Sequence, residues 1–291
     1  MRRLIINADD FGLTPGVNRA ILEGHQHGVV SSATLIANGK AFEDAVQLSR
    51  SVPRLSVGCH VVLTDGVPVL DESRVSTLVE NQQPPRFRES LGNFVVATIT
   101  RRFDTDQIEA EATAQISKLQ AAGIAVSHFD THKHTHLFPQ ILRPLLRAAQ
   151  ARGVGAVRNP FGPVRFAMVA NRPRLWKRYG EVKLLRLLAG KFRAAIEKAG
   201  LKTPDGTLGV VGTGMLDIRL LSAILQDLPH GTWEFLCHPG YNDADLQTVQ
   251  TRLRDSRAEE LRVLTSPAAR ELLGDNGIEL ISYHDFARTA E

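Results

Sequence analysis

Apolar residues along the chain fall into two alternating patterns. Short strand-like runs are separated by longer segments in which apolar residues recur at helical spacing. The strand-like runs cover residues 3–8, 32–37, 55–63, 124–129, 156–158, 234–237 and 279–282. The clearest helical segments cover residues 15–27, 41–51 and 106–122. Strands that alternate with helices indicate a parallel sheet whose strands are joined by crossover helices.

The length of 291 residues allows one large domain or two small ones. For this alternation and length we expect an α/β fold, an irregular TIM-like (β/α) barrel in a single domain over residues 1–291. Two stretches interrupt the alternation, at about residues 68–103 and 161–209. The first is rich in loops and the second in basic residues. Long insertions in such folds often lie over the mouth of the sheet, so we expect both to act as lids.

Composition narrows the class of protein. The hydrophobic fraction of 43% and the charged fraction of 23% are typical of soluble globular proteins. No stretch approaches the roughly 18 consecutive apolar residues of a membrane span, and the start of the sequence has no apolar signal core. We therefore expect a cytoplasmic protein. Cys59 and Cys237 each precede a histidine, and strand neighbours point to opposite faces, so we expect both thiols to be buried away from any site.

The net charge of +4 comes mainly from one region. Between residues 165 and 202, many basic residues are opposed only by Glu181 and Glu197. Such a local excess argues against a protein built for nucleic acid. Within it, residues 177–198 mix lysines and arginines with leucines. This segment is either a lid helix that packs on the barrel or a helix that makes peripheral contact with an anionic membrane.

Candidate chemistry begins with the sequence NADDFG at residues 7–12, where Asp9 and Asp10 follow the first strand-like run. His60 in VGCHVVL and His238 in EFLCHPGY lie at comparable places in later runs. Active sites of parallel sheets gather at the carboxyl ends of the strands, so these side chains should meet. Two adjacent carboxylates can both stay ionised if a cation lies beside them. The doublet therefore favours a metal site.

The sequence SHFDTHKHTHLFP, residues 127–139, strengthens this hypothesis. Four histidines and one aspartate occupy alternate positions, and an extended chain would place all five on one face. These residues are His128, Asp130, His132, His134 and His136. One strand usually presents one or two donors to a metal, so the others would orient those ligands or contact a substrate.

One aspartate and two histidines around a divalent ion with open positions is the usual layout of a hydrolytic metal site. Of the two aspartates in the doublet, one can bind the metal while the other takes a proton from water. A histidine on the opposite side, such as His238, can then protonate the leaving group. This donor set favours one Zn²⁺, while Mg²⁺, Mn²⁺ and Co²⁺ remain open.

Five motifs occur in the order found in YdjC-like carbohydrate deacetylases, namely NADDFG, GCHVVLTDG, SHFDTHKHTH, EFLCHPG and SRAEELRVLTSP…GIELISYHDF. The chain most resembles the branch associated with hopanoid biosynthesis. The resemblance runs from Leu4 to about Phe286 and is weakest in the two insertions. It implies an irregular (β/α) barrel that removes the acetyl group from an N-acetylated sugar with the help of a metal. The implied substrate is an N-acetylglucosaminyl-hopanoid, which would yield the free amine and acetate.

The resemblance also implies roles for single residues. Asp10, His60 and His132 would hold the metal, although His134 remains an alternative to His132. Asp9 would be the general base and His238 the general acid. Arg158 would restrain Asp9 or bind substrate, unless it is a surface arginine. The positions that would orient ligands or contact the sugar are Asp130, His134, His136, Arg158 and Tyr241.

Two other classes of function remain open. A metal phosphoesterase is one, because Asp-x-His-x-His runs also occur in such enzymes, although their sites commonly hold more metals and carboxylates than this sequence supplies. A carbohydrate-binding or metal-binding barrel without turnover is the other. The Asp9–Asp10 doublet argues against it, because a binding protein needs no second carboxylate beside a metal ligand. The sequence leaves the oligomeric state open.

Overall fold

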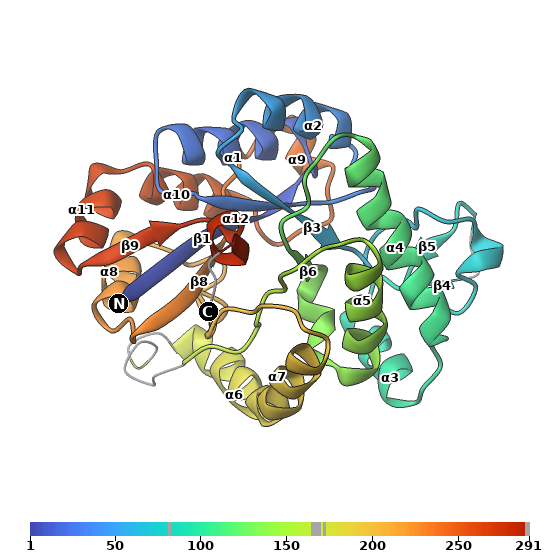
Figure 1. Ribbon diagram of the computed structural model, residues 1–291. Coiled ribbons are helices and arrows are strands. Elements are labelled where there is room, and N and C mark those ends of the chain that lie inside the picture. The colour runs from blue at the N-terminus through green and yellow to red at the C-terminus, as the bar shows by residue number, and fades with distance from the viewer. Residues whose placement is uncertain (81–82, 164–169, 171–172, 289–291) are drawn as a thin grey trace.

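A computed structural model describes residues 1–80, 83–163, 170 and 173–288 of the chain. Its centre is a curled parallel sheet in the order β6-β3-β2-β1-β8-β7 (Figure 1), and β9 pairs with the first half of β1. The strands are β1 (Arg2–Phe11), β2 (Ser32–Leu35), β3 (Ser56–Val61), β6 (Phe129–Thr131), β7 (Gly206–Leu208), β8 (Gly231–Cys237) and β9 (Ile278–Ile281). The fold is mixed α/β with a half-barrel sheet, consistent with a (β/α) barrel-like fold.

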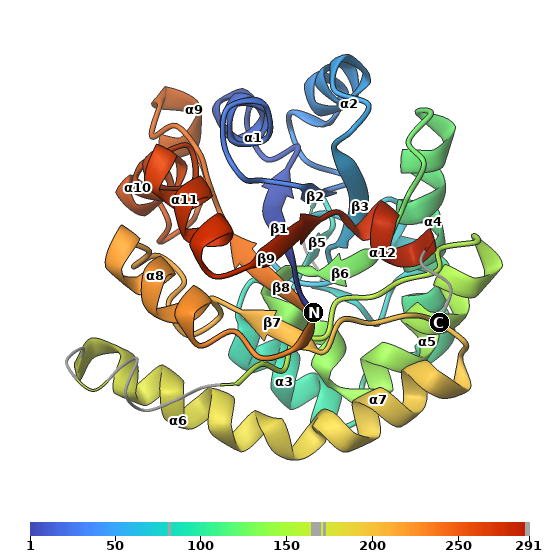
Figure 2. The same cartoon turned by 60° about the vertical axis from the view of Figure 1, so that its left-hand side comes forward.

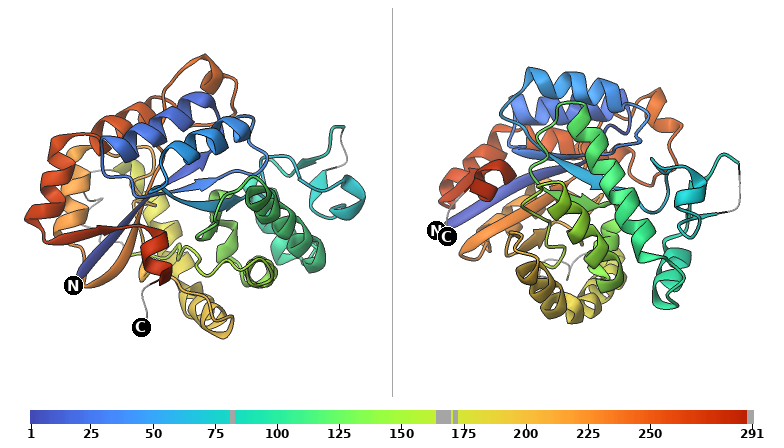
Figure 3. Two further views of the ribbon diagram at one scale, coloured as in Figure 1. Left: turned by 45° about the horizontal axis from the view of Figure 1, so that its top comes forward. Right: turned by 45° about the vertical axis from the view of Figure 1, so that its right-hand side comes forward.

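Helices surround the convex side of this sheet (Figure 2). Both views of Figure 3 place the first two helices on one side of the sheet and the helices of residues 176–198 on the opposite side. The helices are α1 (Pro15–Gln26), α2 (Phe42–Ser51), α3 (Leu91–Ile99), α4 (Thr105–Ala121), α5 (Pro139–Ala151), α6 (Trp176–Leu185), α7 (Ala189–Lys198), α8 (Ile218–Gln226), α9 (Ala244–Gln247), α10 (Asp255–Leu264), α11 (Pro267–Asp275) and α12 (Tyr283–Arg288).

The two edges of the curled sheet are joined irregularly. Isolated bridges link Phe129 to Val157 and Ala156 to Lys202. The strand expected over residues 156–158 is thus reduced to bridges. The strand expected over residues 124–129 is also wrong in its bounds, because β6 covers only Phe129–Thr131. These short contacts replace full strands between β6 and β7.

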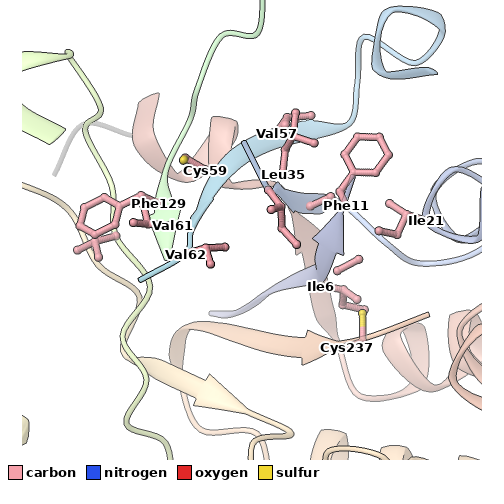
Figure 4. Packing of buried hydrophobic residues seen from close by; sticks show 14 of the residues in the cluster. Ile6, Phe11, Ile21, Leu35, Val57, Cys59, Val61, Val62, Phe129 and Cys237 are labelled. Carbon is pink, nitrogen blue, oxygen red and sulfur yellow. The ribbon is translucent and has the colours of Figure 1, made fainter. Parts of the chain in front are cut away.

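Apolar packing covers the helix-covered face of the central strands, whereas the opposite face carries buried polar side chains such as Thr34, His60 and Glu234. The sequences of β2, β3 and β8 therefore alternate between apolar and polar residues. Figure 4 shows part of this core, including Ile6, Phe11 and both cysteines. Cys59 and Cys237 are fully buried, and burial raises the pKa of each thiol. Both behave as small core side chains, which confirms the prediction for them.

The described residues of the two insertions form separate small elements, and residues 81–82, 164–169 and 171–172 of these insertions lie outside the described part of the chain. The first holds the 3-10 turn η1 (Glu72–Arg74), the antiparallel pair β4 (Val79–Glu80) and β5 (Arg86–Phe87), and α3. The β4–β5 pair projects from one end of the molecule (Figure 1).

The second insertion contains α6, the turn η5 (Arg186–Leu188) and α7, which follow one another as a long rod (Figure 2). Phe192 and Ile196 of α7 are buried, whereas α6 buries no side chain. Among the described residues, no helix combines the length and the apolar character that crossing a membrane requires.

Candidate active site

A distortion at the end of β1 turns both aspartates of the doublet toward the site. The pairing register between β1 and β2 shifts between Ala8 and Phe11, as in a β-bulge. Asp10 adopts a left-handed conformation with φ of 67°, which aspartate tolerates better than most residues. In a regular strand Asp9 and Asp10 would face opposite sides. Here both are buried, each only 4% exposed. Asp9 contacts Arg158 and His238, and Asp10 contacts His60 and His132.

Three donor atoms converge at the mouth of the sheet. Oδ1 of Asp10 lies 3.6 Å from His60 Nε2 and 3.6 Å from His132 Nδ1, and the two nitrogens are 3.3 Å apart. Tetrahedral ligands about 2.0–2.1 Å from a Zn²⁺ ion would be about 3.3 Å apart. The spacing and the donor types therefore fit one shared divalent ion.

Asp130 orients His60 rather than joining this set of donors. The register of β3 and β6 pairs the two residues, and Asp130 Oδ1 lies 2.7 Å from His60 Nδ1. This hydrogen bond leaves Nε2 of His60 facing Asp10, which is the usual arrangement behind a metal-bound histidine. Burial lowers the pKa of His60, but the carboxylates of Asp130, Asp9 and Asp10 raise it to about 9. The site thus attracts positive charge.

The histidine run is not extended, so the prediction that its five polar residues share one face is wrong. The strand β6 ends at Thr131, and residues 132–137 form the 3-10 segment η2 (His132–Leu137). Within it Lys133 and His134 have left-handed φ values of 55° and 54°. This turn brings His132 to Asp10 and His60 and directs the later histidines elsewhere.

The other histidines of the run have separate environments. His128 stacks on Tyr283 at 3.6 Å between ring centres. His136 contacts the Thr131 hydroxyl at 2.6 Å and the Arg158 carbonyl at 3.2 Å, so it supports the turn and the neighbouring strand segment. His134 lies outside the three-donor group, and its buried Nδ1 has no hydrogen-bond partner among the described residues. Burial lowers the pKa of His134 to about 3.

Arg158 lies at the centre of a buried ionic cluster, so the alternative of a surface arginine is wrong. Its two terminal nitrogens contact the Asp9 carboxylate at 2.6 and 2.9 Å. It also contacts Asp130 at 2.5 Å and Glu234 at 2.6 Å. Burial alone would raise the pKa of Asp9, but the adjacent guanidinium holds it well below its usual range. Burial raises the pKa of Glu234, which also accepts the Tyr283 hydroxyl.

His238 lies beside Asp9 because β1 and β8 pair Ala8 with Cys237, and the next residue of each strand enters the site. His238 Nε2 is 3.9 Å from Asp9 Oδ2, and its side chain is 12% exposed. Burial lowers the pKa of His238 to about 4, although Asp9 and Asp10 act in the opposite direction. The imidazole is therefore neutral at pH 7.

Tyr241 is not part of this group of residues. Its hydroxyl donates to the Glu23 carboxylate on α1, and Arg19 lies over its ring at 5.9 Å. Asp65, by contrast, lies at the site although it was not among the predicted site residues. Its carboxylate lies 4.0 Å from His132 Nε2 and 2.8 Å from Lys133 Nζ. The motif GCHVVLTDG contains it, but nothing in the spacing distinguishes it from a turn aspartate.

Two further residues, Arg257 and Glu260, were also missed. Both are buried on α10, where Arg257 contacts Asp10 and Glu260 contacts the backbone of His238. They belong to the motif SRAEELRVL, whose charged character suggests an exposed helix face. The available signal was the spacing of three residues, which places Arg257 and Glu260 on one side of a helix.

A family model described as YdjC-like protein matches residues 3–275. The chain belongs to the YdjC-like family. It is 35% identical over 286 residues to a carbohydrate deacetylase of Geobacillus stearothermophilus, with 98% of both chains covered. It is 31% identical over 284 residues to a carbohydrate deacetylase of Brevibacillus brevis, which covers 97% of this chain and 99% of that protein.

Two solved structures share the fold of this chain. A protein of Enterococcus faecalis with a suggested role in cellobiose-phosphate cleavage has a TM-score of 0.75 to this YdjC-like chain, with 27% identity and 98% of each chain covered. A lactam utilization protein of Thermus thermophilus has a TM-score of 0.51 at 17% identity, covering 96% of this chain and 99% of that one. The second likeness concerns the fold alone.

Proposed function

We propose that this protein is a metal-dependent carbohydrate N-deacetylase that hydrolyses the acetamide of an N-acetylated amino sugar. The proposal rests on one observation above all. Donor atoms of Asp10, His60 and His132 lie 3.3–3.6 Å apart, with a second carboxylate, Asp9, beside them. The carbohydrate deacetylases among the relatives support the choice of an acetylated sugar as substrate.

Asp10, His60 and His132 would hold the ion, with Zn²⁺ favoured and Mg²⁺, Mn²⁺ or Co²⁺ as alternatives. A divalent ion bound there would polarise the acetamide carbonyl, lower the pKa of a water molecule and stabilise developing negative charge. Asp9 accepts a proton from the attacking water. The Arg158 guanidinium keeps Asp9 ionised and fixes its direction, although it also weakens the carboxylate as a base.

His238 donates a proton to the departing amine. Its imidazole is neutral at pH 7, so it must first gain a proton during the reaction. Asp9 Oδ2 lies 3.9 Å from His238 Nε2, so the two side chains must approach to about 3 Å before Asp9 can supply it. The proton removed from water can thus reach the leaving group through two neighbouring side chains, and the products are the free amine and acetate.

The finer substrate proposal is a lipid-linked sugar, an N-acetylglucosaminyl-hopanoid, at the cytoplasmic side of a membrane. The motif resemblance to the hopanoid-associated branch supports it. So does the surface of residues 177–198, where Leu184 and Leu187 are 67% and 79% exposed among basic residues. Sedimentation with anionic vesicles at low and high salt tests this contact. Binding that Leu187→Glu abolishes is expected, and no binding at either salt concentration removes the membrane proposal.

We further propose that the insertions at about residues 68–103 and 161–209 act as lids within a single domain over residues 1–291. Contacts to the turn that carries His132 support this role. Lys133 donates to the Glu89 carbonyl of the first insertion at 3.5 Å. Phe192 of the second insertion packs against His136, with 5.9 Å between ring centres.

Acetate release from N-acetylglucosamine conjugates tests the proposed reaction. The wild type is expected to release acetate, and a chelator is expected to stop it until a divalent ion is restored. A phosphorylated disaccharide serves as a second substrate. Phosphate release without acetate release would replace the proposal by a phosphoesterase, and sugar binding without either product would replace it by a binding protein.

A further inference from the structure

Helix α10 contacts two parts of the candidate active site through buried side chains. Arg257, which is 1% exposed, places Nη2 2.5 Å from Asp10 Oδ2. One turn further along the helix, Glu260 is 2% exposed and its Oε2 accepts the His238 backbone N–H at 2.5 Å. The other oxygen of Glu260 accepts the N–H of Gly214 at 3.3 Å. One helix therefore reaches a candidate metal ligand and the candidate acid.

The turn after His238 also packs directly on Arg257. The N–H of Gly240 donates to the Arg257 carbonyl at 3.2 Å. A Cβ atom at Gly240 would lie 2.9 Å from Cδ of Arg257 and 3.1 Å from Val17, so glycine permits this close approach. The aliphatic part of Arg257 is thus covered by the turn, while its guanidinium reaches past the turn to Asp10.

The contact with Arg257 gives the two carboxylate oxygens of Asp10 different partners. Oδ2 is taken by Arg257, and Oδ1 is the atom that lies 3.6 Å from His60 Nε2 and from His132 Nδ1. The carboxylate therefore presents a single oxygen to the ion site. Arg257 is itself anchored, because its Nε donates to the Leu253 carbonyl at 3.2 Å. Hydrogen bonds of this kind to metal ligands usually change metal affinity or activity when they are removed.

We propose that α10 is the positioning element of this active site, in which Arg257 fixes Asp10 with one oxygen toward the ion and Glu260 fixes the turn that carries His238. Asp10 and His238 come from neighbouring strands, β1 and β8, and side chains of α10 reach both residues. Neither Arg257 nor Glu260 contacts the reacting atoms in this account. Each acts through the residue that it holds. The inference deepens the proposed function, but its part on Arg257 concerns metal binding alone.

Metal affinity tests the role of Arg257 without any substrate. Zn²⁺ is titrated into the metal-free full chain in competition with a chromogenic chelator, for wild type, Arg257→Met and Arg257→Lys. Arg257→Met is expected to bind Zn²⁺ about 10–100-fold more weakly. Arg257→Lys, which retains the charge but not the planar fork, should recover part of the loss. In an Asp10→Asn background, Arg257→Met should change the affinity much less, because the residue that it positions is already altered.

Two results would overturn the role of Arg257. If Arg257→Met and Arg257→Lys both bind Zn²⁺ within twofold of wild type, Arg257 does not position the ligand. If Arg257→Met binds Zn²⁺ more tightly than the wild type, the positive charge of Arg257 only repels the ion. Should Arg257→Met fail to fold by circular dichroism, Arg257→Lys carries the test alone.

Glu260→Gln provides the matched test of the second contact. It is expected to leave Zn²⁺ affinity within twofold of wild type and to lower kcat for acetate release at least tenfold, with a smaller change in KM. Equal losses of Zn²⁺ affinity in the Glu260 and Arg257 variants would indicate a general structural role for α10. They would refute the proposal that Arg257 positions the metal ligand while Glu260 positions the turn of His238. If the wild type binds Zn²⁺ but releases no acetate, the proposed function fails while the Zn²⁺ titrations still decide the role of Arg257.

Discussion

The substitution Arg158→Met removes the guanidinium from the centre of the buried ionic cluster. Arg158 is fully buried and contacts three carboxylates, those of Asp9, Asp130 and Glu234, at 2.5–2.6 Å. Methionine keeps an unbranched apolar stem but ends short of the position of the guanidinium. The carboxylates would remain buried without their common partner. Asp130 would still contact His60, and Glu234 would still accept a hydrogen bond from the Tyr283 hydroxyl.

The expected loss of stability follows from this burial. Removing one partner of a buried ion pair typically costs about 3–5 kcal/mol, because the remaining charge is left uncompensated. The total stability of a domain is about 5–15 kcal/mol, so the loss would be a large fraction of it. The unfolding temperature should fall by on the order of 10 °C.

Urea unfolding at pH 7 in the presence of a chelator measures this effect without stabilisation by bound metal. The matched control is Arg147→Met, which breaks a pair of similar length, 2.5 Å to Glu109, between side chains that are 47% and 32% exposed. That pair should contribute at most about 1 kcal/mol. If Arg158→Met costs no more than Arg147→Met, the buried cluster does not depend on its arginine and the reasoning is wrong.

Three further outcomes are expected. His132→Ala should abolish tight Zn²⁺ binding, whereas His134→Ala should keep it, and equal losses in the same titration would contradict the assignment. Phe192→Ala should destabilise the fold by about 3–5 kcal/mol in urea unfolding, because its ring is buried; a loss below 1 kcal/mol would show that α7 is only loosely attached. Burial raises the pKa of Glu260 from 4.5 to about 7. Protonated Glu260 therefore stabilises the fold below pH 4.5, and this stabilisation is lost as the pH rises through 7. The free energy of unfolding relative to that of Glu260→Gln should fall across this range. A difference between the two proteins that does not change with pH would contradict the raised pKa.

The sequence predicted the parallel sheet because its signals are local. Apolar runs, caps and the alternation of elements depend on neighbours along the chain, and they identify β1, α1 and α4 within a few residues. The bridges around Ala156 were not predictable in this way. They depend on how far the sheet curls, which is set by packing between distant segments.

The candidate site was predicted where strand register determines it. Cys59 pairs with Phe129, so the residues that follow, His60 and Asp130, lie side by side. The histidine turn was not predicted, because its left-handed positions are occupied by Lys133 and His134 and not by glycine, the residue that usually marks such positions.

The contacts of Arg257 were also missed. The residue lies 247 positions from Asp10, and charged residues in a helix are usually exposed. Only the packing of α10 shows that this arginine is buried. The distinction between a surface charge and a positioning residue therefore lies in the tertiary structure.

The most direct measurement is the rate of acetate release from an N-acetylglucosamine conjugate by the Zn²⁺-loaded protein, for wild type and for Asp9→Asn. Release by the wild type is expected, with a rate about 100–10,000-fold lower for Asp9→Asn while Zn²⁺ is still bound, because the amide cannot accept the proton of the attacking water. Release at the wild-type rate by Asp9→Asn, or no release by the Zn²⁺-loaded wild type, would contradict this expectation.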